Sequence, residues 1–158
     1  MRETVSLSIR GSVESPCSYD FDGLAALAGQ VPDVSQLAEG REGGAVTLAA
    51  ILASARPTHD ARFITIEAEG DYSASVPLDA VRNQAVLIYR LGEEPLPSDN
   101  GGPVRFFIPD VAACQTDEID QCANVKYVHS IVLSAERGQD TRPQSLRQHV
   151  GLHLEDQR

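Results

Sequence analysis

Two cysteines and three acidic residues lie close together in one stretch, and these residue types can bind metal ions. Asp117, Glu118 and Asp120 offer hard oxygen ligands, whereas Cys114 and Cys122 offer soft sulfur ligands. Such a mixture suits no single metal well. The cysteine spacing is not that of a common zinc site, and no EF-hand spacing is present. We therefore interpret the stretch as an acidic, solvated loop.

His149 and His153 are four residues apart near the C-terminal end of the sequence. On a helix this spacing places both imidazoles on one face, where they can chelate zinc or copper. A metalloprotease motif needs a glutamate directly after the first histidine, and Val150 stands there instead. Two histidines without a third ligand predict a surface pair rather than a metal site.

The chain has three cysteines, which is an odd number. In a reducing compartment we expect free thiols. Cys114 and Cys122 are close enough along the chain to form a disulfide, and this alternative stays open. Cys17 precedes a predicted helix, whose N-terminal dipole favours a thiolate, but no histidine is near it in sequence.

Length and charge limit the kinds of partner. The 158 residues fit one domain, and the net charge of −10 argues against a nucleic-acid partner, which needs a basic stripe. No polybasic patch and no apolar run of membrane-spanning length are present, so we expect no membrane partner. The first residues lack the apolar core of a secretion signal, which predicts a cytoplasmic protein. An anionic ligand is compatible only where arginine and lysine side chains converge.

The elements that must position any site are predicted from pattern. Helices are expected from a cap at Ser18 or Asp20, over 46–54 with Thr47 as a possible cap, and in a short turn from Asp79. Apolar and alternating runs predict strands. The expected strands cover 4–9, 31–37, 62–68, 70–78, 84–91, 104–108 and 126–133. A main domain over 1–135 is followed by a polar arm and a short C-terminal helix over 136–158.

A turn-rich loop between two of these strands is the most distinctive stretch. It begins with GEEPLP at residues 92–97 and continues with GGPVR at 101–105, before a strand that ends at Pro109. A later strand begins with VKY at 125–127. GGAVTLAAIL at 43–52 and GDYSASVPL at 70–78 complete the set of motifs.

These motifs, in this order, resemble the oxidoreductase molybdopterin-binding domain, the fold of sulfite oxidases and their bacterial relatives. The resemblance covers most of the chain, from about Val5 to Leu133. It implies an α+β fold, with mixed sheets or a barrel-like pair of sheets and short helices. It also implies molybdopterin as the cofactor.

The resemblance places the cofactor by the loop that leads into Val125-Lys126-Tyr127. Asn124 and Lys126 are the implied cofactor-binding residues, and Arg41 can face the same cavity. Members of the family bind molybdenum through a cysteine just upstream of the segment that matches 43–52. Residues 31–43 contain no cysteine, and Ser35 is the nearest small polar residue. A serine hydroxyl is a much weaker metal ligand than a thiolate.

Two functions follow. The first is a molybdopterin-binding oxidoreductase-like protein that lacks the usual cysteine ligand; in an active relative, molybdenum passes an oxygen atom to or from a small substrate. Catalysis here would require Cys17, Cys114 or Cys122 to reach the metal from another element. The second is a non-catalytic scaffold of the same fold that binds another small ligand or a protein partner. The absent cysteine favours the second hypothesis for catalysis.

Overall fold

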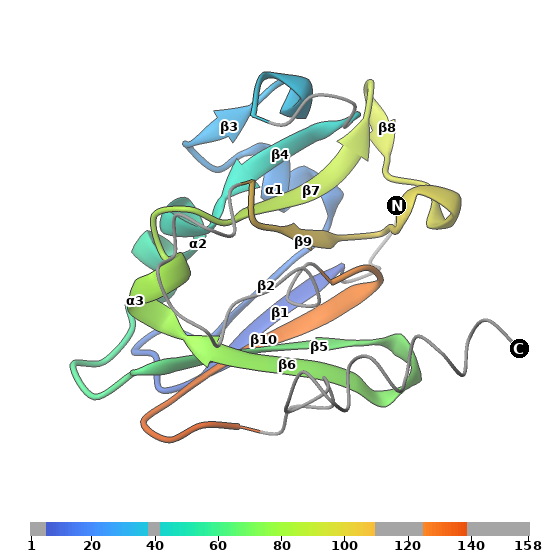
Figure 1. Cartoon of the computed structure of the whole chain (residues 1–158). Helices are drawn as coiled ribbons and strands as arrows, with labels where there is room; N and C mark the ends of the chain where they lie inside the picture. Colours follow the sequence, from blue (N-terminus) through green and yellow to red (C-terminus); the bar gives the residue numbers. More distant parts are fainter. Residues whose placement is uncertain (1–5, 38–41, 110–124, 139–158) are drawn as a thin grey trace, which may run out of the picture.

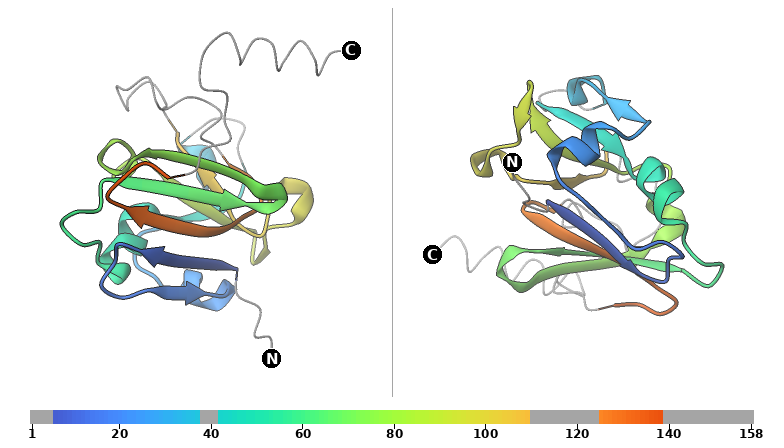
Figure 2. Two further views of the ribbon diagram at one scale, coloured as in Figure 1. Left: turned by 90° about the horizontal axis from the view of Figure 1, so that it is seen from below. Right: turned by 180° about the vertical axis from the view of Figure 1, so that it is seen from behind.

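The computed structural model describes residues 6–37, 42–109 and 125–138. Within them, two five-stranded β-sheets face each other, with short helices beside them (Figures 1 and 2). The expected α+β architecture, a pair of β-sheets with short helices, is confirmed. No helix among the described residues is long and apolar enough to cross a bilayer.

The first sheet, the lower one in Figure 1, has the strand order β2-β1-β10-β5-β6. Its strands are β1 (Leu7–Gly11), β2 (Cys17–Tyr19), β5 (Phe63–Ala68), β6 (Tyr72–Pro77) and β10 (Val128–Ser134). β1 and β10 are parallel, whereas the other neighbours are antiparallel, so the sheet is mixed. The last strand, β10, therefore lies in the middle of the sheet that also contains the first strand, β1.

The second sheet has the order β3-β4-β7-β8, and β9 also pairs with β7. Its strands are β3 (Gln30–Val31), β4 (Gly44–Thr47), β7 (Val86–Leu91), β8 (Glu94–Pro95) and β9 (Arg105–Phe107). β7 is buried on both faces, as its continuous apolar sequence predicts. Leu87 and Tyr89 enter the main core, while Val86 and Ile88 belong to a smaller cluster on the opposite face.

The helices are short. They are α1 (Phe21–Ala25), α2 (Leu48–Ala55), α3 (Leu78–Val81) and the 3₁₀ helices η1 (Val34–Gln36), η2 (Glu69–Asp71) and η3 (Ser98–Asn100). Asp20 caps α1, since its carboxylate accepts a hydrogen bond from the Gly23 amide at 2.7 Å. Thr47 caps α2, since its hydroxyl accepts one from the Ala50 amide at 3.2 Å. Both predicted caps are confirmed.

Three expectations about local structure are wrong. Residues 31–37 do not form one strand: β3 ends at Val31, and η1 follows because Asp33 accepts hydrogen bonds from Ser35. The first part of the predicted helix over 46–54 belongs to β4, so the helix begins at Leu48. Asp79 does not cap α3; Pro77 occupies the N-cap position and Asp79 lies in the first turn.

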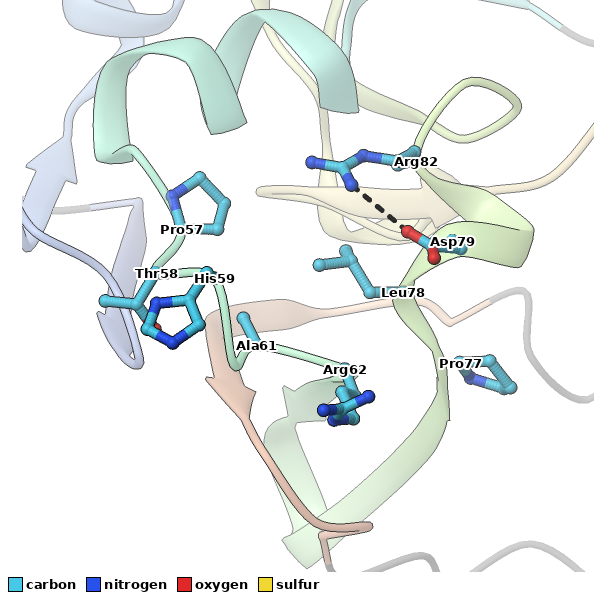
Figure 3. A pocket seen from close by; sticks show the side chains of 9 residues that line it. All are labelled: Pro57, Thr58, His59, Ala61, Arg62, Pro77, Leu78, Asp79 and Arg82. Carbon is cyan, nitrogen blue, oxygen red and sulfur yellow. Dashed lines mark hydrogen bonds and ion pairs between the residues drawn. The ribbon is translucent and has the colours of Figure 1, made fainter.

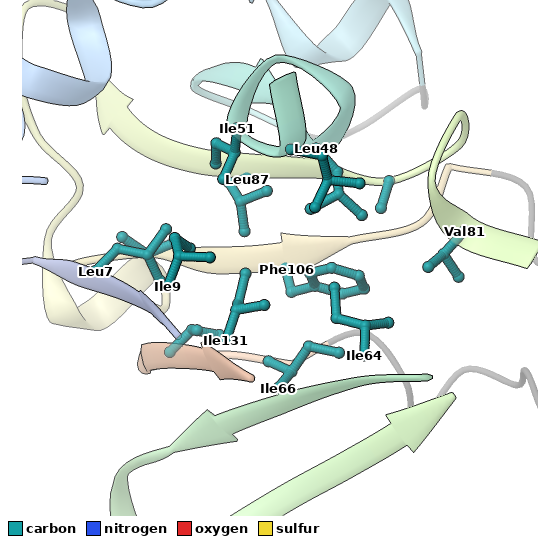
Figure 4. Close-up of a cluster of buried hydrophobic side chains, with 14 of the residues drawn as sticks. Leu7, Ile9, Leu48, Ile51, Ile64, Ile66, Val81, Leu87, Phe106 and Ile131 are labelled. Atoms are coloured by element: carbon teal, nitrogen blue, oxygen red, sulfur yellow. The ribbon is translucent and has the colours of Figure 1, made fainter. Parts of the chain in front are cut away.

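The main core fills the space between the sheets. Figure 4 shows Leu87 and Phe106 from the second sheet facing Ile64, Ile66 and Ile131 from the first. Buried leucine and isoleucine side chains of α2 close one end of this core. The cohesion of the two sheets therefore rests on apolar burial, worth about 1.5–3 kcal/mol for each large side chain.

The first residues of the predicted C-terminal arm contact the first sheet. The Ser134 hydroxyl donates to the carbonyl oxygen of Glu136 at 2.5 Å, and the Gly138 amide donates to the Ser75 hydroxyl at 2.9 Å. Residues 139–158, which include the predicted C-terminal helix, lie outside the described residues. The domain boundary at 135 stays a prediction.

Truncation of the Phe106 side chain should weaken the fold. Phe106 is fully buried in the main core, so Phe106→Ala should lower the free energy of unfolding by about 3–5 kcal/mol. Leu37→Ala is the control: Leu37 is 42% exposed, and its loss should cost less than about 0.5 kcal/mol. Urea denaturation measures both. Equal costs for the two variants would contradict the assignment of Phe106 to the core.

Removal of the Thr47 hydroxyl tests the helix cap. Thr47→Ala leaves the Ala50 amide without its partner and should lower the free energy of unfolding by about 1 kcal/mol. Thr47→Ser keeps the hydroxyl and should retain most of the stability. Thermal unfolding followed by circular dichroism distinguishes the two variants, and the cap assignment fails if serine is as damaging as alanine.

Candidate functional site

The loop from Gly92 to Pro103 is folded tightly against the end of β7. The Leu96 amide donates to the Tyr89 carbonyl at 3.0 Å, and Leu96 is buried. The Gly102 amide donates to the Pro97 carbonyl at 2.9 Å. A Cβ atom at Gly102 would lie 1.8 Å from the Leu96 carbonyl oxygen, so only glycine fits there. The turn residues of the motif thus produce a loop that closes on itself.

The segment before β10 is hydrogen-bonded to this loop and to β9. Val125 and Phe106 exchange backbone hydrogen bonds of 2.8 and 2.9 Å. The Tyr127 amide donates to the Gly101 carbonyl at 2.8 Å, and the Tyr127 carbonyl accepts from the Glu69 amide at 3.1 Å. Tyr127 has a φ of 61°, an uncommon value for a residue with a side chain. The backbone is therefore held by hydrogen bonds at both neighbours of Lys126, Val125 and Tyr127.

Lys126 and Arg105 approach each other across Gly101. A Cβ atom at Gly101 would lie 3.1 Å from Lys126 Cγ and 3.2 Å from Arg105 Cδ, so the stems of both side chains run along this glycine. Lys126 is exposed, and Arg105 is partly buried. An Arg105 terminal nitrogen donates to the Asn100 carbonyl at 3.4 Å. Two cationic side chains from β9 and the start of β10 thus converge beside the loop.

Arg90 is a third cation at the same end of the sheet. In the register of β7 and β9, Arg105 is opposite Ile88, which places Arg90 one diagonal step away on the same face. The Arg90 guanidinium lies across Gly44, where a Cβ atom would be 2.7 Å from Nε. One terminal nitrogen donates to the Gly92 carbonyl at 3.2 Å. The Nε atom is buried and has no hydrogen-bond partner among the described residues.

The face that carries Arg90 and Arg105 is the outer face of the second sheet. It also carries a small apolar cluster, consisting of Val34, Ala45, Val86, Ile88, Leu96 and Phe107. Cations beside an apolar surface interact strongly with an anion, because the local dielectric constant is lower than that of water. We call Arg90, Arg105 and Lys126 the cation cluster. It is the local convergence of positive charge that an acidic chain needs to bind an anion.

The structure places one of the three predicted site residues. Lys126 lies in the cation cluster, whereas Arg41 and Asn124 lie outside the described residues. Sequence reasoning missed Arg90 and Arg105 as site residues. Arg105 was marked by its place inside the GGPVR motif. Arg90 belongs to none of the motifs, and in the sequence it is simply one polar residue near the end of a buried strand.

The described residues contain no group of three or more histidine, cysteine, aspartate or glutamate side chains that could hold a metal ion. Ser35 donates its hydroxyl to Asp33 at 2.7 Å, and this hydrogen bond lowers the pKa of the Asp33 carboxyl. The Ser35 hydroxyl thus acts in the cap of η1. Cys114, Cys122, His149 and His153 lie outside the described residues, so their predicted roles stay predictions.

Cys17 is a free thiol in β2, at the edge of the first sheet. Its thiol donates to the Tyr19 hydroxyl at 3.4 Å. Burial raises the pKa of the Tyr19 phenol, and the contact with Cys17 raises it further. This pair packs against the main core, whereas Ser35 lies beside the second sheet. Cys17 and the described residues of the segment before β4 thus belong to different sheets.

Comparison with solved structures supports the fold. The sulfane dehydrogenase SoxCD from Paracoccus pantotrophus superposes with a TM-score of 0.64 at 18% sequence identity. The match covers 88% of this chain and 40% of that chain, so this chain spans less than half of its neighbour. At this identity the likeness concerns the fold alone. No curated protein sequence matches the chain.

Comparison with protein-family models adds the family. The model of the oxidoreductase molybdopterin binding domain matches residues 43–141, which is more than half of the chain. The matched region begins directly before β4 and includes β9, the loop from Gly92 to Pro103 and all three members of the cation cluster. This chain belongs to the oxidoreductase molybdopterin binding domain family.

Proposed function

We propose that the protein binds a molybdopterin-type cofactor at the cation cluster, on the outer face of the second sheet. The observation that carries the proposal is the approach of Arg105 and Lys126 to each other across Gly101, with Arg90 on the same sheet face, in a chain of net charge −10. Asn124 and Arg41 complete the proposed set of contacts. Membership of the family supports the same ligand.

The donor chemistry fits the anionic part of such a cofactor. Molybdopterin carries a phosphate, and arginine binds phosphate oxygens through two parallel N–H groups. The buried Arg90 Nε lacks a hydrogen-bond partner among the described residues, and an unsatisfied buried donor costs about 1–3 kcal/mol. A phosphate oxygen within reach of this nitrogen would remove that cost. Arg105 and Lys126 supply further positive charge from neighbouring elements.

The apolar cluster on the same face strengthens the interaction with an anion. Ile88 and Phe107 are buried beside the cations, and their apolar surroundings lower the local dielectric constant. When bound, the cofactor supplies the redox chemistry, and the protein supplies binding, orientation and electrostatics. The residues of this chain bind and orient the ligand through the cation cluster.

The second candidate function is a non-catalytic scaffold that binds another small anionic ligand, or a protein partner, at this face. One observation favours it: residues 31–43 contain no cysteine, and the Ser35 hydroxyl is hydrogen-bonded to Asp33. A scaffold of this kind keeps the cation cluster but has no thiolate for molybdenum from this segment. The two functions differ in metal content, so metal analysis separates them.

Charge removal from the cluster should reduce the amount of pterin that the protein retains. The protein is produced in a host that makes molybdenum cofactor, dialysed, and assayed for released pterin by fluorescence and for molybdenum by elemental analysis. Arg105→Gln should lower retained pterin at least about tenfold, because a hydrogen bond to a charged group contributes about 1.5–3 kcal/mol. Lys126→Gln should have a smaller effect, about two- to fivefold, because Lys126 is exposed.

Arg56→Gln is the matched control, since Arg56 is exposed, lies outside the cluster, and makes only exposed side-chain contacts among the described residues: a 3.8 Å contact with Glu14 and a 2.8 Å hydrogen bond to the Ser15 hydroxyl. It should retain pterin at the unsubstituted level. Stoichiometric molybdenum with pterin would favour an oxidoreductase, and pterin without metal would favour a carrier. A folded protein that retains neither would refute cofactor binding and leave the scaffold function.

A further inference from the structure

A surface pocket of about 470 Å³ lies where the turn before β5 meets the end of β6 and α3 (Figure 3). Its lining consists of Pro57, Thr58, His59, Ala61, Arg62, Pro77, Leu78, Asp79 and Arg82. The volume is within the range of about 300–1,000 Å³ that is common for small-molecule sites. The proposed cofactor site uses none of these residues.

This pocket and the cation cluster lie at opposite ends of β10. The Arg62 amide donates to the carbonyl oxygen of Ser134, the last residue of β10, at 2.8 Å. Lys126 stands two residues before the first residue of the same strand. A seven-residue strand spans roughly 20 Å, so a ligand in one site cannot contact the other.

The pocket carries a net positive charge on an acidic protein. Among the described residues of its lining, Arg62 and Arg82 are the two permanent cations and Asp79 is the one carboxylate. Arg82 forms an ion pair with Asp79 at 3.1 Å, but the Asp79 side chain is 90% exposed. The Arg62 guanidinium forms no ion pair with another described residue. Apart from His59, the described lining has a net charge of +1, from two arginines and one aspartate.

Hydrogen bonds fix the backbone on both sides of the pocket. The Leu78 amide donates to the Arg62 carbonyl at 2.9 Å, which joins the two walls directly. The Thr58 amide donates to the Ser12 carbonyl at 2.9 Å, and its hydroxyl donates to the exposed carboxylate of Asp60. That hydrogen bond lowers the pKa of Asp60, which lies beside the pocket but not in its lining. The arginines therefore project from a preorganised frame.

The rest of the lining is apolar. Pro57, Ala61, Pro77 and Leu78 present carbon surface between the charged groups, and Leu78 is buried beneath them. Figure 3 shows Arg82 with Asp79 on one side of the pocket and His59 with Arg62 on the other. A ligand that satisfies this lining has one negative charge and a compact apolar body. A fully polar ion would leave the apolar wall in contact with water.

We propose that this pocket binds a small organic carboxylate, with Arg62 binding the carboxylate, Arg82 on the opposite side adding positive charge, and the proline–leucine wall holding the apolar body. The planar guanidinium matches a carboxylate through two parallel hydrogen bonds. A monoanion balances the net charge of +1. The site is independent of molybdopterin, since its residues belong to other elements at the far end of β10.

The test is an NMR titration of the ¹⁵N-labelled full chain, prepared without cofactor, with benzoate as the probe. Saturable shifts are expected at the amides of Thr58, Arg62 and Leu78, with no change at Gly101 or Tyr127 in the other site. Benzamide has the same shape without the charge and should bind at least about tenfold more weakly, since a charged hydrogen bond contributes about 1.5–3 kcal/mol. Inorganic phosphate should bind more weakly than benzoate.

The double variant Arg62→Gln with Arg82→Gln should weaken benzoate binding at least about tenfold, because each of the two solvent-accessible charges should contribute a few-fold to the affinity. Arg56→Gln removes one positive charge from a nearby exposed residue outside the lining and should leave binding unchanged. Each of four results overturns the proposal: no saturable shift, equal binding of benzamide, equal binding by the double variant, or tighter binding of phosphate than of benzoate.

Discussion

Five backbone hydrogen bonds hold residues 125–128 between the two sheets, and the candidate cofactor site depends on them. Two join Val125 to Phe106 in the second sheet, two join Tyr127 to Gly101 and Val128 to Val104, and the fifth joins the Glu69 amide to the Tyr127 carbonyl. Directly afterwards the chain enters β10 and pairs with β1 and β5 in the first sheet. Tyr127, with its positive φ, lies at this change of sheet; its amide donates to the Gly101 carbonyl, and its carbonyl accepts from the Glu69 amide. The backbone of Lys126 therefore stays beside Gly101 as long as these bonds hold.

The same constraint explains how an acidic protein assembles positive charge. Like charges on neighbouring side chains repel each other, and the repulsion grows as water is excluded. Arg90 and Arg105 are held on one sheet face by the pairing of β7 with β8 and β9, so their separation is set by strand register rather than by their own interaction. The apolar cluster beside them is buried with the sheet. The free energy that brings the cations together thus comes from apolar burial and backbone pairing.

The sequence predicted well those features that depend on local chemistry. Thr47 before an apolar helical run indicates a cap, and the glycines and prolines of residues 92–103 indicate a turn-rich loop. The strand predicted over 31–37 failed because its apolar residues, Val31, Val34 and Leu37, recur every third position, which is typical of a helical turn rather than of a strand. Asp33, two residues before Ser35, was the local signal for that turn.

Features that depend on pairing between distant segments were not predictable in the same way. Arg105 alternates with Phe106 along its strand, and only the register with Ile88 places it on the outer face beside Arg90. The pocket beside α3 needs residues 57–62 and 77–82 together. The β5–β6 hairpin brings them together by pairing Phe63 with Pro77. In an antiparallel hairpin, the start of the first strand lies beside the end of the second. Prediction of the two strands from the sequence therefore locates the pocket only when their antiparallel pairing is also known.

Phosphate binding and metal ligation can separate in this fold because they belong to different elements. The proposed phosphate contacts come from β7, β9 and the start of β10, whereas the family's metal-binding cysteine precedes β4. Replacement of that cysteine changes neither the register of β7 with β9 nor the hydrogen bonds of residues 125–128. The positions of the cations depend instead on that register and on the close approach of the Arg90 guanidinium to Gly44. A change in the segment before β4 would therefore leave the proposed anion site unaltered, and the two properties can be tested separately.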